Sequence, residues 1–253
     1  MTTQTWSGLN TRLLDGLLLI ALFLAVWQGL YEYAGDAVIT SPLTTLDYAS
    51  SLVKTSNFWT HAQATLVAFA YALVISMVLG VLLGLVLGVQ RFSGDVAEPI
   101  LVALYTIPKI TLYPLILLIF GLGVSAKVAF GVIHGVIPII LFTLNAVKNI
   151  NPVLIRTSRV MRLSLWQTAS TVLTPAVMPE LITGVRVGFS LTMLGVLIGE
   201  MFASQRGLGF LIINGINLHN VRITTAVILI VVLFAILANG LLLAFDKRMH
   251  RTA

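Results

Sequence analysis

The residues of this chain most suited to acting on another molecule lie in a polar interruption, residues 150–186, between two strongly apolar stretches. Only 9% of the 253 residues are charged, yet Arg156, Arg159 and Arg162 stand close together here. Such a cluster of cations in an otherwise apolar chain indicates a surface that contacts a partner.

A helix-capping signal follows the arginines. Ser164 and Gln167 have the S-x-x-Q spacing in which each side chain bonds the backbone amide of the other residue at a helix N-terminus. The spacing predicts a short helix that carries Trp166. Pro175 and Pro179 are expected to break the chain before the next apolar helix begins. We therefore predict a short amphipathic helix at a membrane surface, suited to docking a partner.

Three residues inside apolar stretches are candidates to line or gate a path through the membrane: Lys109, Glu200 and Met193. An ionisable residue at membrane depth usually faces a protein interior or an aqueous path, so Lys109 is a candidate to attract an anionic substrate. Its long side chain could equally reach the membrane surface. Glu200 is expected near the outer end of its helix, where it either belongs to a gate or is simply solvated.

The sequence predicts no enzyme site and no catalytic, cofactor or metal residue. Residues 121–128 have a Gly and a Lys at the separation found in a phosphate-binding loop. Ala126 and Val128 replace the second Gly and the Ser/Thr, so phosphate and Mg²⁺ would not be held. The absence of cysteine excludes disulfides and thiolate chemistry. The net charge of +6 forms no basic surface with stacking aromatics, so nucleic acid is not an expected partner.

The elements that must position these residues are membrane helices. The chain is 58% hydrophobic, and several apolar runs reach the roughly 20 residues that a helix needs to cross a bilayer. We predict an all-α polytopic membrane protein, a single domain over residues 1–253. Its six expected spans are Leu13–Tyr33, Thr65–Val89, Ile100–Gly121, Val128–Val147, Leu181–Ala203 and Val221–Phe245.

Glycines recur at helical spacing in the second and fifth expected spans. Because Gly-x-x-x-Gly lets helix backbones approach closely, these rows predict helix packing. Ordinary packing within the chain is the simpler interpretation, and a subunit interface or a face that slides during gating is the alternative. The glycines are Gly80, Gly84 and Gly88, and Gly184, Gly188, Gly195 and Gly199.

The placement of Lys and Arg predicts the orientation, since cytoplasmic loops carry the excess of basic residues. With both termini inside, nine basic residues fall on the cytoplasmic side: Arg12, Arg91, Lys148, Arg156, Arg159, Arg162, Lys247, Arg248 and Arg251. Four fall outside: Lys54, Lys127, Arg206 and Arg222. The arginine cluster is thus expected in the cytoplasm.

The segment from residue 156 to residue 179 resembles the cytoplasmic EAA loop of ABC importer permeases. The residues that coincide with the family pattern are Ser164, Trp166, Gln167, Pro175, Ala176 and Pro179. Arg156, Thr157 and Ser158 occupy the Glu-Ala-Ala positions, Arg162 the Gly position and Thr174 the Leu position. The resemblance continues through Glu200-Met201 and Gly207-Leu-Gly209, and is closest to the nitrate, sulfonate and taurine branch.

This resemblance implies the transmembrane subunit of a type I ABC importer in the bacterial inner membrane, with a cytoplasmic coupling helix. A second permease subunit, identical or paralogous, would complete the pathway, and ATPase subunits holding ATP and Mg would dock below. An outer solute-binding protein would deliver a small nutrient, such as a sulfonate, nitrate or nitrogenous compound, to Gly207–Gly209 and the neighbouring outer loops. The ATPase-coupling residues would be Arg159, Arg162, Ser164, Trp166, Gln167, Pro175 and Pro179.

Two other functions remain open from the sequence. A secondary carrier would be expected to show an inverted repeat and coupling-ion carboxylates near the membrane midplane, and neither is clear in this chain. A membrane scaffold without transport activity is the second alternative. An adjacent ATPase and binding-protein reading frame would discriminate both from an importer.

Overall fold

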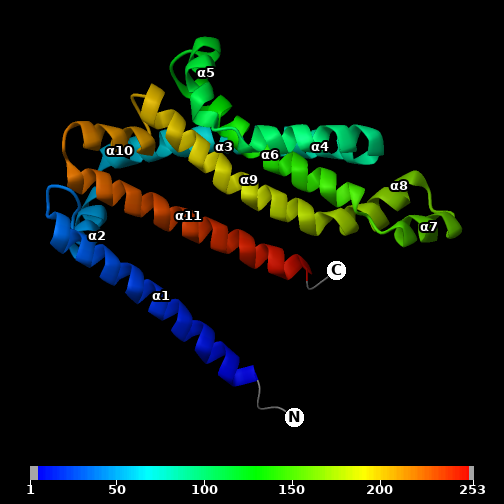
Figure 1. Ribbon diagram of the computed structural model, residues 1–253, viewed down its shortest axis with the longest axis horizontal. Helices are drawn as coiled ribbons and strands as arrows, with labels where there is room; N and C mark the ends of the chain where they lie inside the picture. Colours follow the sequence, from blue (N-terminus) through cyan, green and yellow to red (C-terminus); the bar gives the residue numbers. More distant parts are fainter. Residues whose placement is uncertain (1–4, 251–253) are drawn as a thin grey trace. The chain divides into compact units, whose positions relative to one another are not determined.

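A computed structural model describes residues 5–250, and its side chains over 14–244 apart from 91, 165 and 203 (Figure 1). All regular elements in this range are helical. They are α1 (Thr5–Ala34), α2 (Pro42–Leu52), α3 (Ser56–Val89), α4 (Arg91–Thr106), η1 (Lys109–Leu112), α5 (Tyr113–Phe120), α6 (Val124–Lys148), α7 (Pro152–Val160), α8 (Leu165–Gln167), the π-helical η2 (Thr168–Leu173), α9 (Thr174–Ala203), α10 (Leu208–Asn217) and α11 (Val221–His250).

Five helical segments among the described residues are long and apolar enough to cross a membrane, and there are six if a bent helix pair is counted as one span. The five straight segments are Leu14–Ala34, Ser56–Val89, Val124–Lys148, Thr168–Phe202 and Val221–Ala244. The predicted second and fifth spans therefore begin too late. Apolar side chains alone mark the predicted bounds, whereas the helices continue into more polar sequence.

The predicted third span, Ile100–Gly121, is not one continuous helix. It consists of Phe92–Thr106 and Lys109–Phe120, which meet at 85°. The cause is visible at Ile107, whose backbone is extended (ψ 134°) because the ring of Pro108 disfavours helical geometry in the residue before it. Pro114 stands in the first turn of α5, where a proline costs no hydrogen bond.

The chain divides into two compact units. The first comprises Met1–Trp59 and Leu211–Val231, and the second Thr60–Phe210 and Val232–Ala253. In the first unit the hydroxyl of Thr40 bonds those of Thr45 (2.6 Å) and Thr225 (2.7 Å), and the indole of Trp27 donates to the carbonyl of Thr40 at 3.0 Å. These bonds fix the segment between α1 and α2 against α11.

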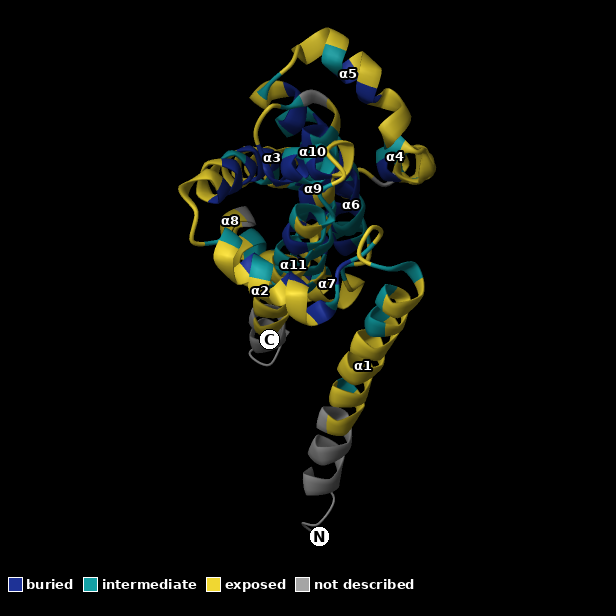
Figure 2. Ribbon diagram, turned by 90° about the vertical axis from the view of Figure 1, so that its left-hand side faces the viewer, coloured by how far each residue is buried: buried dark blue, intermediate teal, exposed yellow. Residues whose placement is uncertain are grey.

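In the second unit α6 and α9 run side by side and carry most of the buried surface (Figures 1 and 2). Both glycine rows face α6. A Cβ at Gly80 of α3 would lie 2.6 Å from the side chain of Ile139, and one at Gly188 of α9 would lie 2.5 Å from it. Ile139 thus packs between two glycine surfaces and is fully buried. The absence of a side chain lets all three backbones approach closely.

An ion pair joins α4 to the end of α6. The ammonium of Lys148 lies 2.5 Å from the carboxylate of Asp95 and 2.8 Å from that of Glu98. Lys148 is the last residue of α6, directly before the polar segment that contains α7 and α8. The first half of the bent span, α4, is therefore tethered to the end of α6 that precedes the arginine cluster.

Candidate functional site: the coupling segment and a buried polar junction

The coupling segment, residues 150–179, begins with a capped helix. The side chain of Asn151 accepts a hydrogen bond from the amide of Val153 at 2.9 Å, and α7 follows. After α7 the chain turns at Arg162, whose backbone has φ 51°. The amide of Leu163 donates to the carbonyl of Ser158 at 3.0 Å and closes this turn. The position at which the importer loop has a glycine therefore keeps a left-handed backbone, with arginine there instead.

The predicted capping box is present. The amide of Gln167 donates to the hydroxyl of Ser164 at 3.2 Å, and the amide of Ser164 donates to the side-chain oxygen of Gln167 at 2.9 Å. Two amides that a helix start leaves without partners are thereby satisfied. The cap fixes the direction in which α8 leaves the turn, and with it the position of Trp166.

Pro175 and Pro179 do not break the chain, contrary to the sequence prediction. Helical structure is continuous from α8 through η2 into α9. The π-helical turn stands directly before Pro175, where a proline ring would otherwise collide with the carbonyl four residues earlier. The hydroxyl of Thr183 donates to the carbonyl of Pro179 at 3.1 Å. The wider π-helical turn accommodates Pro175, and Pro179 stands inside the α-helical α9.

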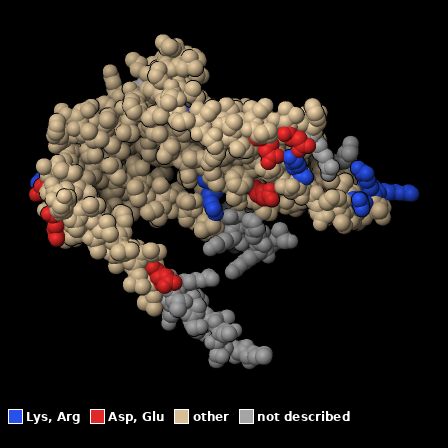
Figure 3. Space-filling view, in the orientation of Figure 1, with Lys and Arg blue, Asp and Glu red and all other residues tan. Residues whose placement is uncertain are grey.

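The turn between α7 and α8 exposes a mixed apolar and basic surface, the docking surface. Its apolar members are Val160 (83% exposed), Met161 (64%) and Trp166 (79%). Arg159 and Arg162 are exposed beside them. Figure 3 shows basic side chains gathered over the end of the molecule that carries α7 and α8. An exposed tryptophan among cations is typical of a surface that a partner covers.

Replacing Arg162 with glycine is expected to raise the thermal stability of the chain slightly. A residue with a Cβ in left-handed geometry costs about 1–2 kcal/mol, and glycine removes this cost. The measurement is the denaturation midpoint of the purified protein. Arg159, which lies in α7, is the matched control, since Arg159→Gly removes a charge without relieving strain and should lower the midpoint.

Lys109 lies at the bend of the third span. Its ammonium donates to the carbonyl of Tyr105 at 2.9 Å and stands 5.0 Å from the centre of the Tyr105 ring. The kink after α4 frees carbonyls that a continuing helix would have bonded, and this ammonium satisfies one of them. The side chain is partly exposed. The geometry thus assigns Lys109 a capping contact within its own turn.

Met193 is buried in the second unit, 5% exposed, within an apolar cluster that includes Phe69, Ala72 and Val196. Its side chain therefore contributes to the packing of α9 against α3. Among the described side chains, the polar contacts of Lys109, those of Glu200 and the apolar cluster of Met193 each involve different residues.

Glu200 is the centre of a buried polar junction in the second unit. Its side chain is 0% exposed, so the solvated alternative is wrong. The hydroxyl of Thr65 in α3 donates to the two carboxylate oxygens at 2.8 and 3.0 Å. The amide of Gly209 in α10 donates to the carboxylate at 3.0 Å, and the ammonium of Lys127 in α6 lies 3.5 Å away. One carboxylate thus contacts three other helices.

The same junction holds the start of α10. The amide of Leu208 donates to the hydroxyl of Thr65 at 2.8 Å, and the amide of Gly207 donates to Nδ1 of His61 at 3.1 Å. Lys127 donates to the carbonyl of Arg206 at 2.6 Å. Amides that a helix start leaves without partners, those of Gly207, Leu208 and Gly209, are therefore satisfied by side chains of α3 and α9.

Sequence reasoning missed Lys127, Thr65 and His61 as members of this junction. Lys127 was expected outside the membrane spans, whereas it lies in the first turn of α6 and is 3% exposed, with its charge paired to that of Glu200. The only signal in the sequence was that Lys127 and Glu200 carry opposite charges and are both expected at the outer ends of apolar stretches. Thr65 and His61 gave none, since a threonine and a histidine on an apolar helix are compatible with many packings.

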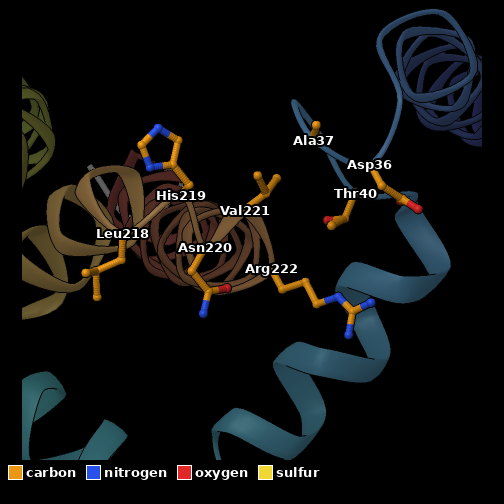
Figure 4. A pocket seen from close by; sticks show the side chains of 8 residues that line it. All are labelled: Asp36, Ala37, Thr40, Leu218, His219, Asn220, Val221 and Arg222. Carbon is orange, nitrogen blue, oxygen red and sulfur yellow. The ribbon is translucent and has the colours of Figure 1, made fainter.

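A polar hollow of about 370 Å³ lies in the first unit (Figure 4). Its lining comes from the segment between α1 and α2 and from the turn between α10 and α11, and includes Asp36, His219, Asn220 and Arg222. His219 has a left-handed backbone, φ 53°. A second hollow, of about 470 Å³, is lined in the second unit by residues that include Phe202 and Gln205.

Taken together, the apolar spans, the bent helix pair and the capped surface segment define a polytopic membrane protein of the transporter class. The family described as "binding-protein-dependent transport system inner membrane component" matches residues 76–251. The chain belongs to this family: it is the inner-membrane permease of a binding-protein-dependent ABC importer and is not itself a catalyst, the ATPase activity residing in partner subunits.

Several relatives are similar to this chain. The riboflavin transport system permease protein RibX of Chloroflexus aurantiacus is 34% identical over 76% of this chain and 73% of its own length. The taurine permease TauC of Escherichia coli is 24% identical over 91% and 86%. The putative aliphatic sulfonates permease SsuC of Bacillus subtilis is 24% identical over 79% and 74%.

A solved structure supports the fold. A chain of the inward-facing methionine ABC transporter MetNI has a TM-score of 0.60 to this protein, with 21% sequence identity. The match covers 78% of this chain and 95% of that chain. The all-helical architecture with five to six membrane spans is therefore that of a known importer permease.

Proposed function

We propose that this chain couples ATP hydrolysis in ATPase subunits to substrate movement through the coupling segment, residues 150–179. The observation that carries the proposal is the exposed Trp166 on a helix start whose geometry is fixed by Ser164 and Gln167. A rigid, exposed apolar anchor surrounded by cations is suited to a partner groove with an acidic rim. ATP and Mg bind in the partner subunits, and a second permease subunit completes the pathway.

The proposed orientation places both termini and the coupling segment in the cytoplasm. It follows the distribution of Lys and Arg, in which the coupling segment contributes Arg156, Arg159 and Arg162. Part of that argument concerns residues not described in full: Arg251 lies outside the described residues, and the side chains of Arg12, Arg91, Lys247 and Arg248 are likewise not described.

The outer solute-binding protein is proposed to contact exposed residues rather than Gly207–Gly209. Those three residues are buried in the polar junction, so they are not available for the contact expected from the sequence. Gln205 and Arg206 beside them are exposed. In the first unit, Asp36 and Arg222 at the polar hollow offer charges of both signs to a partner.

The proposed substrate is a small nutrient, with sulfonates and nitrogenous compounds as the leading classes. The support comes from relatives whose names specify taurine, aliphatic sulfonates and riboflavin. Lys109 is the candidate to favour an anion, since its ammonium lies at the bend of the span that most departs from a straight helix. In the alternative, Lys109 only caps α4, and its replacement with methionine would then leave uptake unchanged.

Replacing Lys109 with methionine is expected to lower the uptake of an anionic substrate by roughly tenfold if the ammonium faces the pathway, because one lost charge contact at partial burial costs about 1–2 kcal/mol. Uptake by proteoliposomes measures this effect. Lys109→Arg, which keeps both the charge and the cap, is the matched control. Full uptake by Lys109→Met would leave the residue as a helix cap alone.

The experiment that tests the proposed function is purification of the chain together with the products of its neighbouring genes, followed by native mass measurement and ATP-driven uptake. The expected particle holds two permease subunits and two ATPases, and takes up substrate only with ATP and a loaded binding protein. Uptake driven by an ion gradient without ATP would instead indicate a secondary carrier. A stable chain with no ATPase partner and no uptake would indicate a scaffold.

A further inference from the structure

The coupling segment and the buried polar junction lie on the same continuous helix. From Trp166 in α8 to Glu200 near the end of α9, helical structure is uninterrupted. About 34 residues at 1.5 Å per residue separate them, which is roughly 50 Å along the axis. In Figure 1 α9 extends from the end that carries α7 and α8 to the end at which α10 begins. A displacement at one end of this continuous helix is therefore transmitted to its other end.

Near its C-terminal end, α9 is hydrogen-bonded to the segment that follows it in the chain. Glu200 accepts the amide of Gly209, so the carboxylate on the last turns of α9 holds the first turn of α10. A carboxylate at a helix N-terminus is stabilised by the amides that point toward it, and a charge-assisted bond in a buried site is stronger than an exposed one. Residues 207–210 are thus fixed to α9 by a bond, beyond their chain connection.

The backbone at Gly207 and Gly209 lies so close to α9 that a side chain would not fit at either position. A Cβ at Gly207 would lie 2.1 Å from the carboxyl carbon of Glu200, and Gly207 has φ 131°, a backbone that favours glycine. A Cβ at Gly209 would lie 2.3 Å from the carbonyl oxygen of Leu197. Both glycines of the Gly-Leu-Gly sequence are required because the loop backbone rests directly on α9.

We propose that Glu200 is a positioning residue that makes the first turn of α10 follow α9 during the transport cycle, with Thr65 and Lys127 as its supports; this rests on the proposed coupling function. A movement of the docking surface then reaches residues 204–210 at the opposite end of the unit. Without the bond between Glu200 and the amide of Gly209, α9 moves and residues 204–210 do not. ATP is then hydrolysed without a matching movement of substrate.

The alternative is a plain ion pair that only holds α6 and α9 together. The two functions of Glu200 can be separated, because glutamine keeps an oxygen acceptor for the Gly209 amide and lysine keeps a charge but offers no acceptor. Glu200→Gln with Lys127→Met neutralises the pair and keeps the acceptor. Glu200→Lys with Lys127→Glu keeps opposite charges and removes it.

The experiment compares these two double variants in the assembled complex, with uptake per ATP hydrolysed as the readout. The neutral pair loses the bond from Lys127 to the carbonyl of Arg206 but keeps an acceptor for the amide of Gly209, so it is expected to stay within about threefold of the wild-type ratio. The swapped pair is expected to lose roughly tenfold or more while ATP hydrolysis persists, since the amide of Gly209 is left buried without an acceptor. Equal ratios in the two variants, at any level, would overturn the proposal.

A second pair guards against a swapped variant that fails to fold. Thr65→Val removes the hydroxyl that accepts the Leu208 amide and donates to Glu200, at nearly unchanged volume, and Thr65→Ser keeps it. We expect Thr65→Val to lower the ratio and Thr65→Ser to restore it. A spin label at the exposed Gln205 should respond to ATP in Thr65→Ser and in wild type, but not in Thr65→Val. A label that responds equally in all three would contradict the proposed role of Glu200.

Failure of this proposal is distinguishable from failure of the proposed function. If the wild-type complex shows ATP-driven uptake while every junction variant matches it, the coupling function stands and Glu200 is only structural. If the wild-type complex itself shows no ATP-driven uptake, the proposed function fails first.

Discussion

Replacing Trp166 with glutamate is expected to uncouple transport from ATP hydrolysis. Trp166 is 79% exposed on the docking surface, and the backbone that carries it is ordered by the capping bonds between Ser164 and Gln167. A charge placed in an apolar anchor site opposes burial against the ATPase. The loss at an interface anchor is typically about 2 kcal/mol or more, which corresponds to a roughly 30-fold decrease in coupled uptake.

The measurement is ATP-driven uptake by proteoliposomes, together with co-purification of the ATPase subunits. Trp166→Phe is the matched control, because it keeps an apolar ring on the same capped turn and should retain most of the uptake. Since Trp166 is mostly exposed, the glutamate variant should insert and fold like the wild type. Normal uptake by Trp166→Glu would show that the docking surface is not where the ATPase binds.

Local features of the coupling segment could be predicted from the sequence because their partners are close in the chain. Ser164 and Gln167 are three residues apart, and their two bonds follow from this spacing alone. The effect of Pro175 and Pro179 could not be predicted, since a proline either ends a helix or is accommodated by a wider turn. Here a π-helical turn accommodates Pro175, and helix-breaking statistics contain no information about that choice.

The bend of the third span was only half visible in the sequence. Pro108 and Pro114 lie in this span, but the spans were placed by apolar composition, which does not change across the bend. The angle of 85° is fixed by packing and by the extended backbone at Ile107. Hydropathy therefore locates membrane segments well and their geometry poorly.

The polar junction could not be derived because its members are distant in sequence. The bond between Thr65 and Glu200 joins residues 135 positions apart, and that between Lys127 and Glu200 joins residues 73 apart. Each residue has several plausible environments when taken alone. Only the packing of α3, α6 and α9 selects one of them, and the glycine rows that permit this packing indicated close approach without indicating the partner helix.

The largest expected effect on stability comes from that packing. A Cβ at Gly135 of α6 would lie 1.8 Å from the hydroxyl of Thr192 in α9, and 3.1 Å from both the carbonyl of Gly188 and the hydroxyl of Ser76. Gly135→Ala is therefore expected to destabilise the protein by about 1–3 kcal/mol, the usual cost of overpacking. Thermal denaturation of the purified protein measures it. Gly29→Ala is the matched control, since a Cβ there meets nothing within 4 Å.

A second substitution should rescue the first if the stated clash is the cause. Among the described residues the hydroxyl of Thr192 has no hydrogen-bond partner, so Thr192→Ala loses no bond and removes the atom nearest the new Cβ. Gly135→Ala with Thr192→Ala should recover most of the lost stability, whereas Thr192→Val keeps a methyl group near that position and should not. The difference between these double variants measures the contact directly. Equal stability of the two would place the cost of Gly135→Ala in the α6–α9 backbone contact at Gly188 instead.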